Sequence, residues 1–268
     1  MFQLKAKLLY NKRIKGNYLQ CVLQVPKIAK EAQPGQFVNL KLSNNTEPLL
    51  RRPFSIHRVG QEPKTRDTIE ILYEVVGPGT EIFAQKKTGE YLDVLGPLGS
   101  GFSVLGTCYP VLVAGGMGAA PLIFLAETII TRSQGQKVTR KPLVLIGAKT
   151  KKQILCEKEF KELGCDVKIA TDDGSRGFQG KVTALLKKVL PGTRYPVPGT
   201  TIYACGPKPM LKEISRLSQR YDIPAQLSLD EHMACGIGAC LGCVVKTKAG
   251  FQRACKDGPV FKAEEIIW

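Results

Sequence analysis

The sequence predicts an antiparallel β-barrel, followed by a parallel α/β domain and a small cysteine-rich C-terminal subdomain. Short β-like runs broken by turn residues fill residues 2–94, whereas strand, glycine turn and helix alternate from residue 109. Four of the nine cysteines lie within residues 235–255. We therefore predict domains at residues 1–103, 104–225 and 226–268, which a chain of 268 residues is long enough to support.

The barrel is predicted from apolar and β-branched runs separated by turn residues. A short helix is expected to begin near Thr80, and a glycine–proline turn at residues 96–99 ends the series. The predicted strands span residues 3–9, 18–25, 36–42, 54–58, 68–75 and 91–95.

The α/β domain is predicted from strands that alternate with helices, a pattern that implies a parallel sheet. Residues 109–130 contain one charged residue, Glu127, but their glycines and proline indicate a strand and a helix instead of a membrane span. The predicted strands are 110–114, 143–147, 167–171 and 201–204, and the helices are 121–132, 158–163, 181–189 and 207–221.

The composition is that of a globular protein, with 43% hydrophobic and 23% charged residues. A formal net charge of +16 would suit nucleic acid, an anionic membrane or an acidic protein partner. The basic residues are dispersed, however, so a solvated basic surface explains the charge best. The odd number of cysteines argues against a disulfide framework, and the first 25 residues contain no secretory signal. We expect a cytoplasmic protein.

The cysteine spacing carries the most specific chemistry. Cys235, Cys240 and Cys243 form C-x4-C-x2-C, and Cys255 follows after eleven residues. This is close to the plant-type spacing of a [2Fe-2S] cluster with a distal fourth thiolate. The intervening glycines suit a loop that must turn tightly around an inorganic cluster.

Two other kinds of metal site fit these residues less well. A four-thiolate zinc site is the main alternative, but zinc usually takes its cysteines in C-x2-C pairs, and only one such pair is present here. A Rieske-type centre needs two histidines. His232 lies near the motif, whereas His57 lies far away in the barrel, so we interpret His232 as a structural residue or one beside the ligands.

Two barrel segments are suited to a flavin dinucleotide. Residues 52–55 start a strand. There the guanidinium of Arg52 can form two hydrogen bonds with a pyrophosphate, and the hydroxyl of Ser55 can reach a flavin ring edge. Residues 72–74 lie on a later strand, and residues 77–80 lead into a helix whose free N–H groups favour a diphosphate. If either segment stood alone, a structural turn followed by a helix cap would be the preferred interpretation. The predicted FAD-binding residues are Arg52, Pro53, Phe54, Ser55, Leu72, Tyr73, Glu74, Gly79 and Thr80.

A nicotinamide dinucleotide is predicted at the carboxyl edge of the parallel sheet. Gly115, Gly116 and Gly118 follow a buried strand and open a helix, where phosphates can approach the backbone, although the full G-x-G-x-x-G pattern is absent.

Two further strand ends are assigned to the same site. Cys205, Gly206 and Pro207 end a later strand, although a lone cysteine is more often a buried small hydrophobe. Asp172 closes another strand, where its carboxylate suits ribose hydroxyls and repels a 2′-phosphate. NAD is therefore favoured over NADP, although the neighbouring Arg176 weakens that preference.

The order of these motifs resembles the ferredoxin–NADP reductase superfamily, with its R-x-[YF]-S, G-G-x-G-x-x-P and C-G-P segments. Residues 231–243, EHMACGIGACLGC, and 254–261, ACKDGPVF, look like the electron transfer subunits of class 1B dihydroorotate dehydrogenase. The similarity runs over essentially the whole chain. One departure is Phe54 in place of the common Tyr, which alters flavin contacts through the loss of a hydroxyl.

This resemblance implies an FAD-binding barrel, a nicotinamide-binding domain and a [2Fe-2S] cluster held by Cys235, Cys240, Cys243 and Cys255. It also implies a catalytic subunit that holds FMN and oxidises dihydroorotate, in a heterotetramer of two subunits each. Electrons would then pass from FMN through the cluster and FAD to NAD+, and this chain would have no catalytic acid or base of its own. The alternatives are a reductase of the same build that serves a ferredoxin, hydrogenase or sulfur-reducing partner, and a zinc-stabilised nucleic-acid-binding module.

Overall fold

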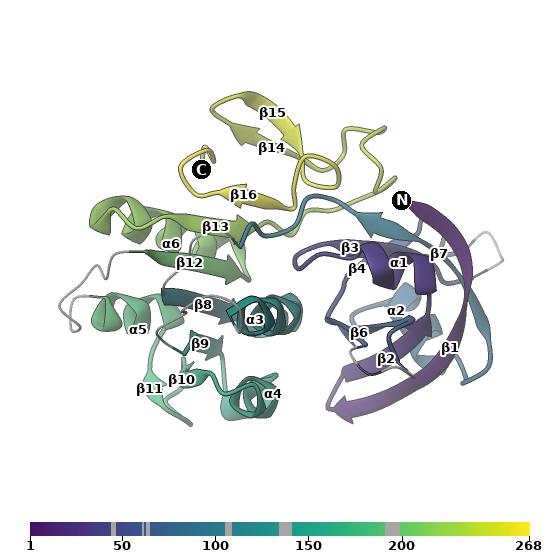
Figure 1. The fold of residues 1–268 in the computed structure, drawn as a ribbon, viewed down its shortest axis with the longest axis horizontal. Helices are drawn as coiled ribbons and strands as arrows, with labels where there is room; N and C mark the ends of the chain where they lie inside the picture. Colours follow the sequence, from purple (N-terminus) through teal and green to yellow (C-terminus); the bar gives the residue numbers. More distant parts are fainter. Residues whose placement is uncertain (44–46, 61, 63–64, 105–108, 134–140, 191–198) are drawn as a thin grey trace. The chain divides into compact units, whose positions relative to one another are not determined.

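A computed structural model describes residues 1–43, 47–60, 62, 65–104, 109–133, 141–190 and 199–268. These residues divide into two compact units (Figure 1). The barrel unit comprises Met1–Gly101, Glu231–Val244 and Arg253–Pro259, and the sheet unit comprises Phe102–Asp230, Val245–Gln252 and Val260–Trp268.

The barrel unit is built on an antiparallel sheet with the strand order β4-β3-β7-β1-β2-β6-β5. Its strands alternate buried and more exposed side chains, as expected for a sheet with one face on a core. Two helices accompany it, α1 (Pro26–Glu31) and α2 (Pro78–Gln85). The strands are β1 (Phe2–Lys15), β2 (Tyr18–Gln24), β3 (Phe37–Lys41), β4 (Arg52–Ser55), β5 (Arg58–Val59), β6 (Thr68–Glu74) and β7 (Tyr91–Leu98).

The sheet unit contains a second sheet with the order β11-β10-β9-β8-β12-β13-β16, parallel except for β16. The central strands β8 and β9 are almost entirely buried, as in a sheet covered by helices on both faces. The strands are β8 (Tyr109–Gly115), β9 (Leu143–Ala148), β10 (Asp166–Thr171), β11 (Phe178–Gln179), β12 (Thr200–Cys205), β13 (Ala225–Ser228) and β16 (Val260–Lys262).

The helices of the sheet unit present apolar stripes to that sheet. In α6, Leu211, Ile214 and Leu217 recur at helical spacing and are buried. The helical elements are η1 (Gly116–Gly118), α3 (Ala119–Ser133), η2 (Lys151–Gln153), α4 (Glu157–Glu162), α5 (Val182–Val189) and α6 (Lys208–Tyr221). Among the described residues, none of the helices has the length and apolar character needed to cross a bilayer.

The predicted fold class is confirmed, but β1 is longer than expected. The strand is predicted to end at Leu9, yet it continues to Lys15. Its pairing with β2 has two irregularities, and the basic side chains of this extension are exposed to solvent.

The C-terminal segment is shared between the two units. Residues 231–244 and 253–259 join the barrel unit, whereas β16 adds an antiparallel edge to the parallel sheet. A two-stranded sheet, β14 (Val244–Thr247) with β15 (Gly250–Arg253), lies between these parts in sequence. Ile266 belongs to the core of the sheet unit, whereas Ile267 and Trp268 remain 43% and 37% exposed. The three-domain division stays a prediction.

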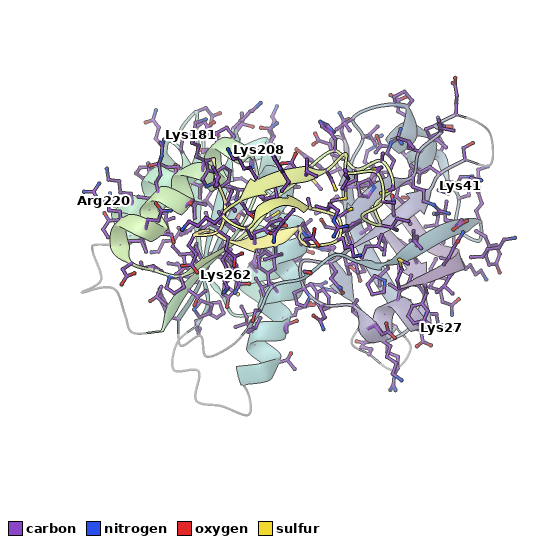
Figure 2. All side chains as sticks on the ribbon, turned by 90° about the horizontal axis from the view of Figure 1, so that it is seen from above. Lys27, Lys41, Lys181, Lys208, Arg220 and Lys262 are labelled. Atoms are coloured by element: carbon purple, nitrogen blue, oxygen red, sulfur yellow. The ribbon has the colours of Figure 1, made fainter. Side chains whose placement is uncertain are left out.

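The positive charge is spread over many elements. Figure 2 labels six basic side chains that come from α1, β3, β16, the start of α5 and both ends of α6. They are Lys27, Lys41, Lys262, Lys181, Lys208 and Arg220. This distribution agrees with a solvated basic surface.

Candidate functional site

The four motif cysteines all lie in the barrel unit, on two loops. Cys235, Cys240 and Cys243 lie on the loop before β14, and Cys255 lies just after β15. Cys243 and Cys255 pack against Phe37 and Leu98 of the barrel and are 2% and 1% exposed. Cys240 is exposed, so one edge of the set faces solvent.

Backbone N–H groups of the loop before β14 point at sulfur atoms on both loops. The Cys235 Sγ accepts from Ala239, Cys240 and Ile237 at 3.3, 3.4 and 3.5 Å. Gly238 donates to Cys255 Sγ at 3.1 Å, so the two loops are joined through a sulfur atom. Such donors stabilise thiolates and the clusters that they ligate.

Glycines make this loop possible. Gly238 has φ +84°, and a Cβ there would lie 2.7 Å from the Cδ atom of Lys256. Gly236 has φ +70° and is buried. The backbone therefore follows a path that residues with a side chain rarely adopt.

The sulfur atoms differ in their electrostatic environment. Burial acts to raise the pKa of Cys235, but the N–H groups of Ile237, Cys240 and Ala239 outweigh it and lower the pKa to about 6. Burial, together with the neighbouring Cys243, raises the pKa of Cys255 to about 12. A thiol as buried as Cys255 becomes a thiolate when a cation binds it. The donor set thus fits a metal centre with one exposed edge.

An arginine that the sequence analysis did not single out holds the two loops together. Arg253 forms a two-pronged ion pair with Asp257, at 2.9 and 3.0 Å, and its Nη1 donates to the Gly238 carbonyl at 3.2 Å. The i,i+4 spacing of Arg253 and Asp257 around Cys255 is the signal that could have found it.

Arg52 lies against the first turn of α2. Its Nε lies 3.1 Å from the point that a Cβ on Gly79 would occupy, so Gly79 leaves room for the guanidinium. Its Nη1 donates to the Leu50 carbonyl at 2.7 Å. A guanidinium beside a helix N-terminus is an arrangement that suits a diphosphate.

Thr80 is engaged within that turn. Its hydroxyl accepts from the N–H groups of Val76 and Gly77 at 2.9 and 3.1 Å and donates to the Gly77 carbonyl at 2.9 Å. The side chain therefore orders the start of α2, leaving the helix backbone as the group able to meet a ligand.

The remaining predicted flavin residues surround an aromatic group. The rings of Tyr73 and Phe83 stack at 4.5 Å, and Phe54 lies 5.8 and 5.3 Å from them. Tyr73 is buried and donates to Asn11 Oδ1 at 2.9 Å. Asn11 Nδ2 donates to the carbonyls of Phe83 in α2 and of Lys86, the C-cap of that helix. Asn11, which sequence reasoning missed, therefore fixes α2 against β6.

The predicted flavin residues differ in how far their side chains are exposed. Ser55 is exposed, Pro53 and Phe54 are half-buried, and Leu72 is 6% exposed. Among the described residues, β5 pairs with β6 only at Ile69 and Glu70, so the ladder on that edge stops before residues 72–74. The Arg52 guanidinium, the α2 N-terminus and this strand edge fit a flavin dinucleotide.

In the sheet unit, the predicted glycine turn packs backbone against backbone. A Cβ on Gly118 would lie 2.0 Å from the Cys205 carbonyl oxygen, and one on Gly206 would lie 3.0 Å from the Gly115 Cα. Gly116 has φ +53°, and in the described part of the chain no atom lies within 4 Å of the position that its Cβ would take. Because β8 and β12 are parallel neighbours, with Ala114 opposite Cys205, the two turns meet at one edge of the sheet.

Cys205 itself is a half-buried thiol at this edge. Burial raises its pKa to about 12, and a hydrogen bond with Ser228 only partly offsets that effect. The thiol is therefore neutral at physiological pH. Pro207 follows as the cap of α6 and lies beside the Gly115 Cβ position, at 2.8 Å.

Asp172 lies just after β10 at the same carboxyl edge. Its Oδ2 accepts from Lys181 Nζ at 2.6 Å. Arg176 is paired with Glu157 at 2.7 Å. The cation that weakened the predicted NAD preference thus has an acidic partner, whereas Asp172 shares its carboxylate with a lysine.

Comparison with known proteins agrees with this geometry. Residues 230–267 match the family model described as the iron–sulfur cluster binding domain of dihydroorotate dehydrogenase B. Residues 112–216 match the oxidoreductase NAD-binding domain.

Two relatives that match this chain over nearly its full length have the same name. The chain is 40% identical to the dihydroorotate dehydrogenase B (NAD(+)) electron transfer subunit of Desulforamulus reducens, over 98% of this chain and 97% of the relative. It is 36% identical to the subunit of the same name from Caldanaerobacter subterraneus, over 100% and 99%.

Solved structures share the fold. The NADH-dependent reduced ferredoxin–NADP oxidoreductase, described in connection with flavin-based electron bifurcation, is 28% identical with a TM-score of 0.83, over 98% of this chain and 90% of that one. A ferredoxin–NADP+ reductase from Neisseria gonorrhoeae, solved with FAD and NADP, has a TM-score of 0.66 at 18% identity, over 82% and 91%.

Proposed function

The chain belongs to the family of dihydroorotate dehydrogenase B (NAD(+)) electron transfer subunits, and from that membership we propose its function. It passes electrons from a catalytic subunit through a [2Fe-2S] cluster and FAD to NAD+, as part of the dihydroorotate oxidation of pyrimidine biosynthesis. In this proposal the catalytic subunit holds FMN, and the complex is a cytoplasmic heterotetramer of two subunits each.

The observation that carries the proposal is the set of four cysteines on two interlocked loops. Cys235, Cys240, Cys243 and Cys255 are the proposed ligands, and the N–H groups aimed at their sulfur atoms support negative charge there. A flavin supplies the link between hydride exchange with a nicotinamide and single-electron exchange with an iron–sulfur cluster.

Each group of residues has a separate task in this proposal. Arg52 and the α2 N-terminus hold the FAD diphosphate, and the half-buried Phe54 lies where a flavin ring edge is expected. Gly115, Gly116, Gly118, Cys205, Gly206 and Pro207 form the NAD edge, where the neutral Cys205 thiol brings no charge to the nicotinamide. Asp172 holds a ribose hydroxyl.

The face that meets the catalytic subunit is proposed to surround Cys240. Ile237 and Leu241 on the same loop are 44% and 60% exposed, and Val244 at the start of β14 is 39% exposed. Exposed apolar side chains of this kind mark interaction sites. Since Cys240 is the exposed cysteine of the four, an electron entering through it crosses the least protein.

The first test is the visible spectrum of the protein purified without oxygen, with iron and acid-labile sulfide counted on the same sample. The proposal expects flavin bands over broad iron–sulfur absorption, with about two irons and two sulfides per chain. A colourless protein that contains one zinc would overturn it.

A substitution then tests the order of transfer. Cys240→Ser is expected to abolish electron exchange with the catalytic subunit while NADH still reduces a small artificial acceptor through FAD. Cys165→Ser is the matched control, because Cys165 is a buried cysteine of the sheet unit away from the motif. Normal coupled turnover in Cys240→Ser would show that the cluster assignment is wrong.

The likeness to the reduced ferredoxin–NADP oxidoreductase supports one other candidate, a reductase subunit for a ferredoxin or similar acceptor. A screen of acceptors separates the two. Faster NADH-dependent reduction of a ferredoxin than of the FMN-containing catalytic subunit would favour this second candidate.

A further inference from the structure

Asn39 is a buried polar residue in an otherwise apolar part of β3. Its neighbours Val38 and Leu40 are fully buried core residues, and the Asn39 side chain has no exposure. Within the described residues, its Oδ1 has no hydrogen-bond partner. A buried amide with an unpaired oxygen costs free energy, so the stability of the sheet does not explain an asparagine at this position.

The other end of the amide contacts the cluster loop. Asn39 Nδ2 donates to the Cys235 carbonyl at 3.3 Å. It also lies 2.4 Å from the point that a Cβ on Gly236 would occupy. The peptide between Cys235 and Gly236 therefore packs directly against the Asn39 side chain. A residue other than glycine at position 236 would be strained by the positive φ, and its Cβ would clash with Asn39.

The Cys235–Gly236 peptide begins the turn whose N–H groups donate hydrogen bonds to the Cys235 sulfur. The N–H groups of Ile237, Ala239 and Cys240, which point at Cys235 Sγ, follow within five residues. A shift of the Cys235 carbonyl would rotate this turn and lengthen those hydrogen bonds.

Asn39 also lies opposite the proposed flavin strand. In the β3–β4 ladder Asn39 pairs with Pro53, which lies between Arg52 and Phe54. One residue of β3 is thus bonded to the cluster loop through its side chain and registered against the flavin strand through its backbone. Both connections lie within the barrel unit.

We propose that Asn39 is a positioning residue for the cluster, which fixes the Cys235 turn and its N–H···S hydrogen bonds relative to the strand that carries Arg52 to Ser55. The inference rests on the proposed function, because it concerns the cluster that the four cysteines would hold. It adds a determinant of the reduction potential that lies outside the cysteine motif, since N–H···S hydrogen bonds raise the potential by stabilising the reduced cluster.

The test compares Asn39→Ala with Leu23→Ala, a truncation in the core of β2 that leaves the cluster loops untouched. Each protein is purified without oxygen, and its cluster is characterised by its reduction potential, its electron paramagnetic resonance spectrum and the rate of iron loss to a chelator. Asn39→Ala is expected to show a lower potential, a changed spectrum and iron loss about tenfold faster. Leu23→Ala is expected to lower the unfolding temperature and leave all three cluster properties unchanged.

A second pair of variants tests the contact itself. Gly236→Ala places a Cβ against Asn39, and the clash is relieved when Asn39 is also alanine. The potential shift of the double variant is therefore expected to be smaller than the sum of the two single shifts. If Asn39→Ala does not fold, Asn39→Asp keeps the shape, removes the amide donor and is measured in the same way.

The outcomes separate this inference from the proposed function. If the protein without substitutions contains no iron and no sulfide, both the proposed function and the role of Asn39 are overturned. If the cluster is present but Asn39→Ala has the same potential, spectrum and iron-loss rate as the protein without substitutions, the role of Asn39 alone is overturned. The same holds if the effects of Asn39→Ala and Gly236→Ala simply add.

Discussion

The cluster loops and the glycine turn of the parallel sheet are both rich in glycine, but glycine has a different task in each. In the cluster loop, Gly236 and Gly238 adopt positive φ angles and face side chains, Asn39 and Lys256. In the sheet unit, Gly118 has no need of a positive φ, and its missing Cβ allows two backbones to meet.

The surroundings differ as well. The glycine turn is anchored by β8 and β12, which are buried strands of a seven-stranded sheet. The cluster loops have a small apolar contact with Phe37 and Leu98, and many of their N–H groups point at sulfur instead of carbonyl oxygen. From this comparison we expect the nucleotide edge to be formed by the fold itself, whereas the cluster loops should depend on the group that they bind.

Removal of the cluster should produce the largest difference between the two regions. Metal-centre binding contributes on the order of 10 kcal/mol to the folding of small thiolate domains, so its loss should free the loops. Hydrogen exchange after chelation is expected to show lost protection at residues 237–240, with β8 and β9 unchanged. Retained protection at residues 237–240 would mean that the loops are formed without their ligand.

Gly118→Ala should have the next largest effect, because the added Cβ would lie 2.0 Å from a backbone oxygen that cannot move alone. We expect a loss of about 3 kcal/mol in the free energy of unfolding, together with weaker NADH binding. Gly116→Ala is the matched control, since its Cβ would meet no atom of the described residues and the substitution carries only the strain of φ +53°, about 1 kcal/mol. Equal losses in denaturant titrations would refute the backbone-contact argument.

Much of this architecture follows from the sequence. The alternation of buried strands, glycine turns and helices in residues 109–221 predicts the parallel sheet, because each strand end and cap is encoded locally. The spacing of the four cysteines likewise predicts that they gather, since a cluster ligand set is written in a short segment.

Long-range contacts could not be predicted in this way. The partners of Asn11 and Asn39 are 72 and 196 residues away, at Phe83 and Cys235, and no local pattern links them. The placement of β16 against β13 is equally invisible, because three residues contain no useful periodicity.

Arg52→Lys tests whether the flavin side is preformed like the nucleotide edge. Arg52 reaches Gly79 with a planar guanidinium that a lysine cannot copy. We expect the dissociation constant of FAD to rise about tenfold, equivalent to about 1.4 kcal/mol, while the unfolding temperature of the FAD-free protein stays the same. Arg216→Lys, in an exposed pair on α6, is the control, and equal FAD affinity in both variants would remove Arg52 from the site.

Asp172→Asn should have the smallest effect, because it concerns an exposed pair at the edge of the preformed site. The substitution removes the carboxylate that would repel a 2′-phosphate and deprives Lys181 of this partner, so its ammonium can attract the phosphate instead. Exposed charges contribute about 0–1 kcal/mol, so the ratio of kcat/KM for NADPH to that for NADH should rise by about fivefold or less. Asp166→Asn, at the opposite end of β10, should leave the ratio unchanged. A ratio unaffected by Asp172→Asn would place nucleotide selection elsewhere on the sheet edge, and the Asp172–Lys181 pair would then serve the local structure of the strand end alone.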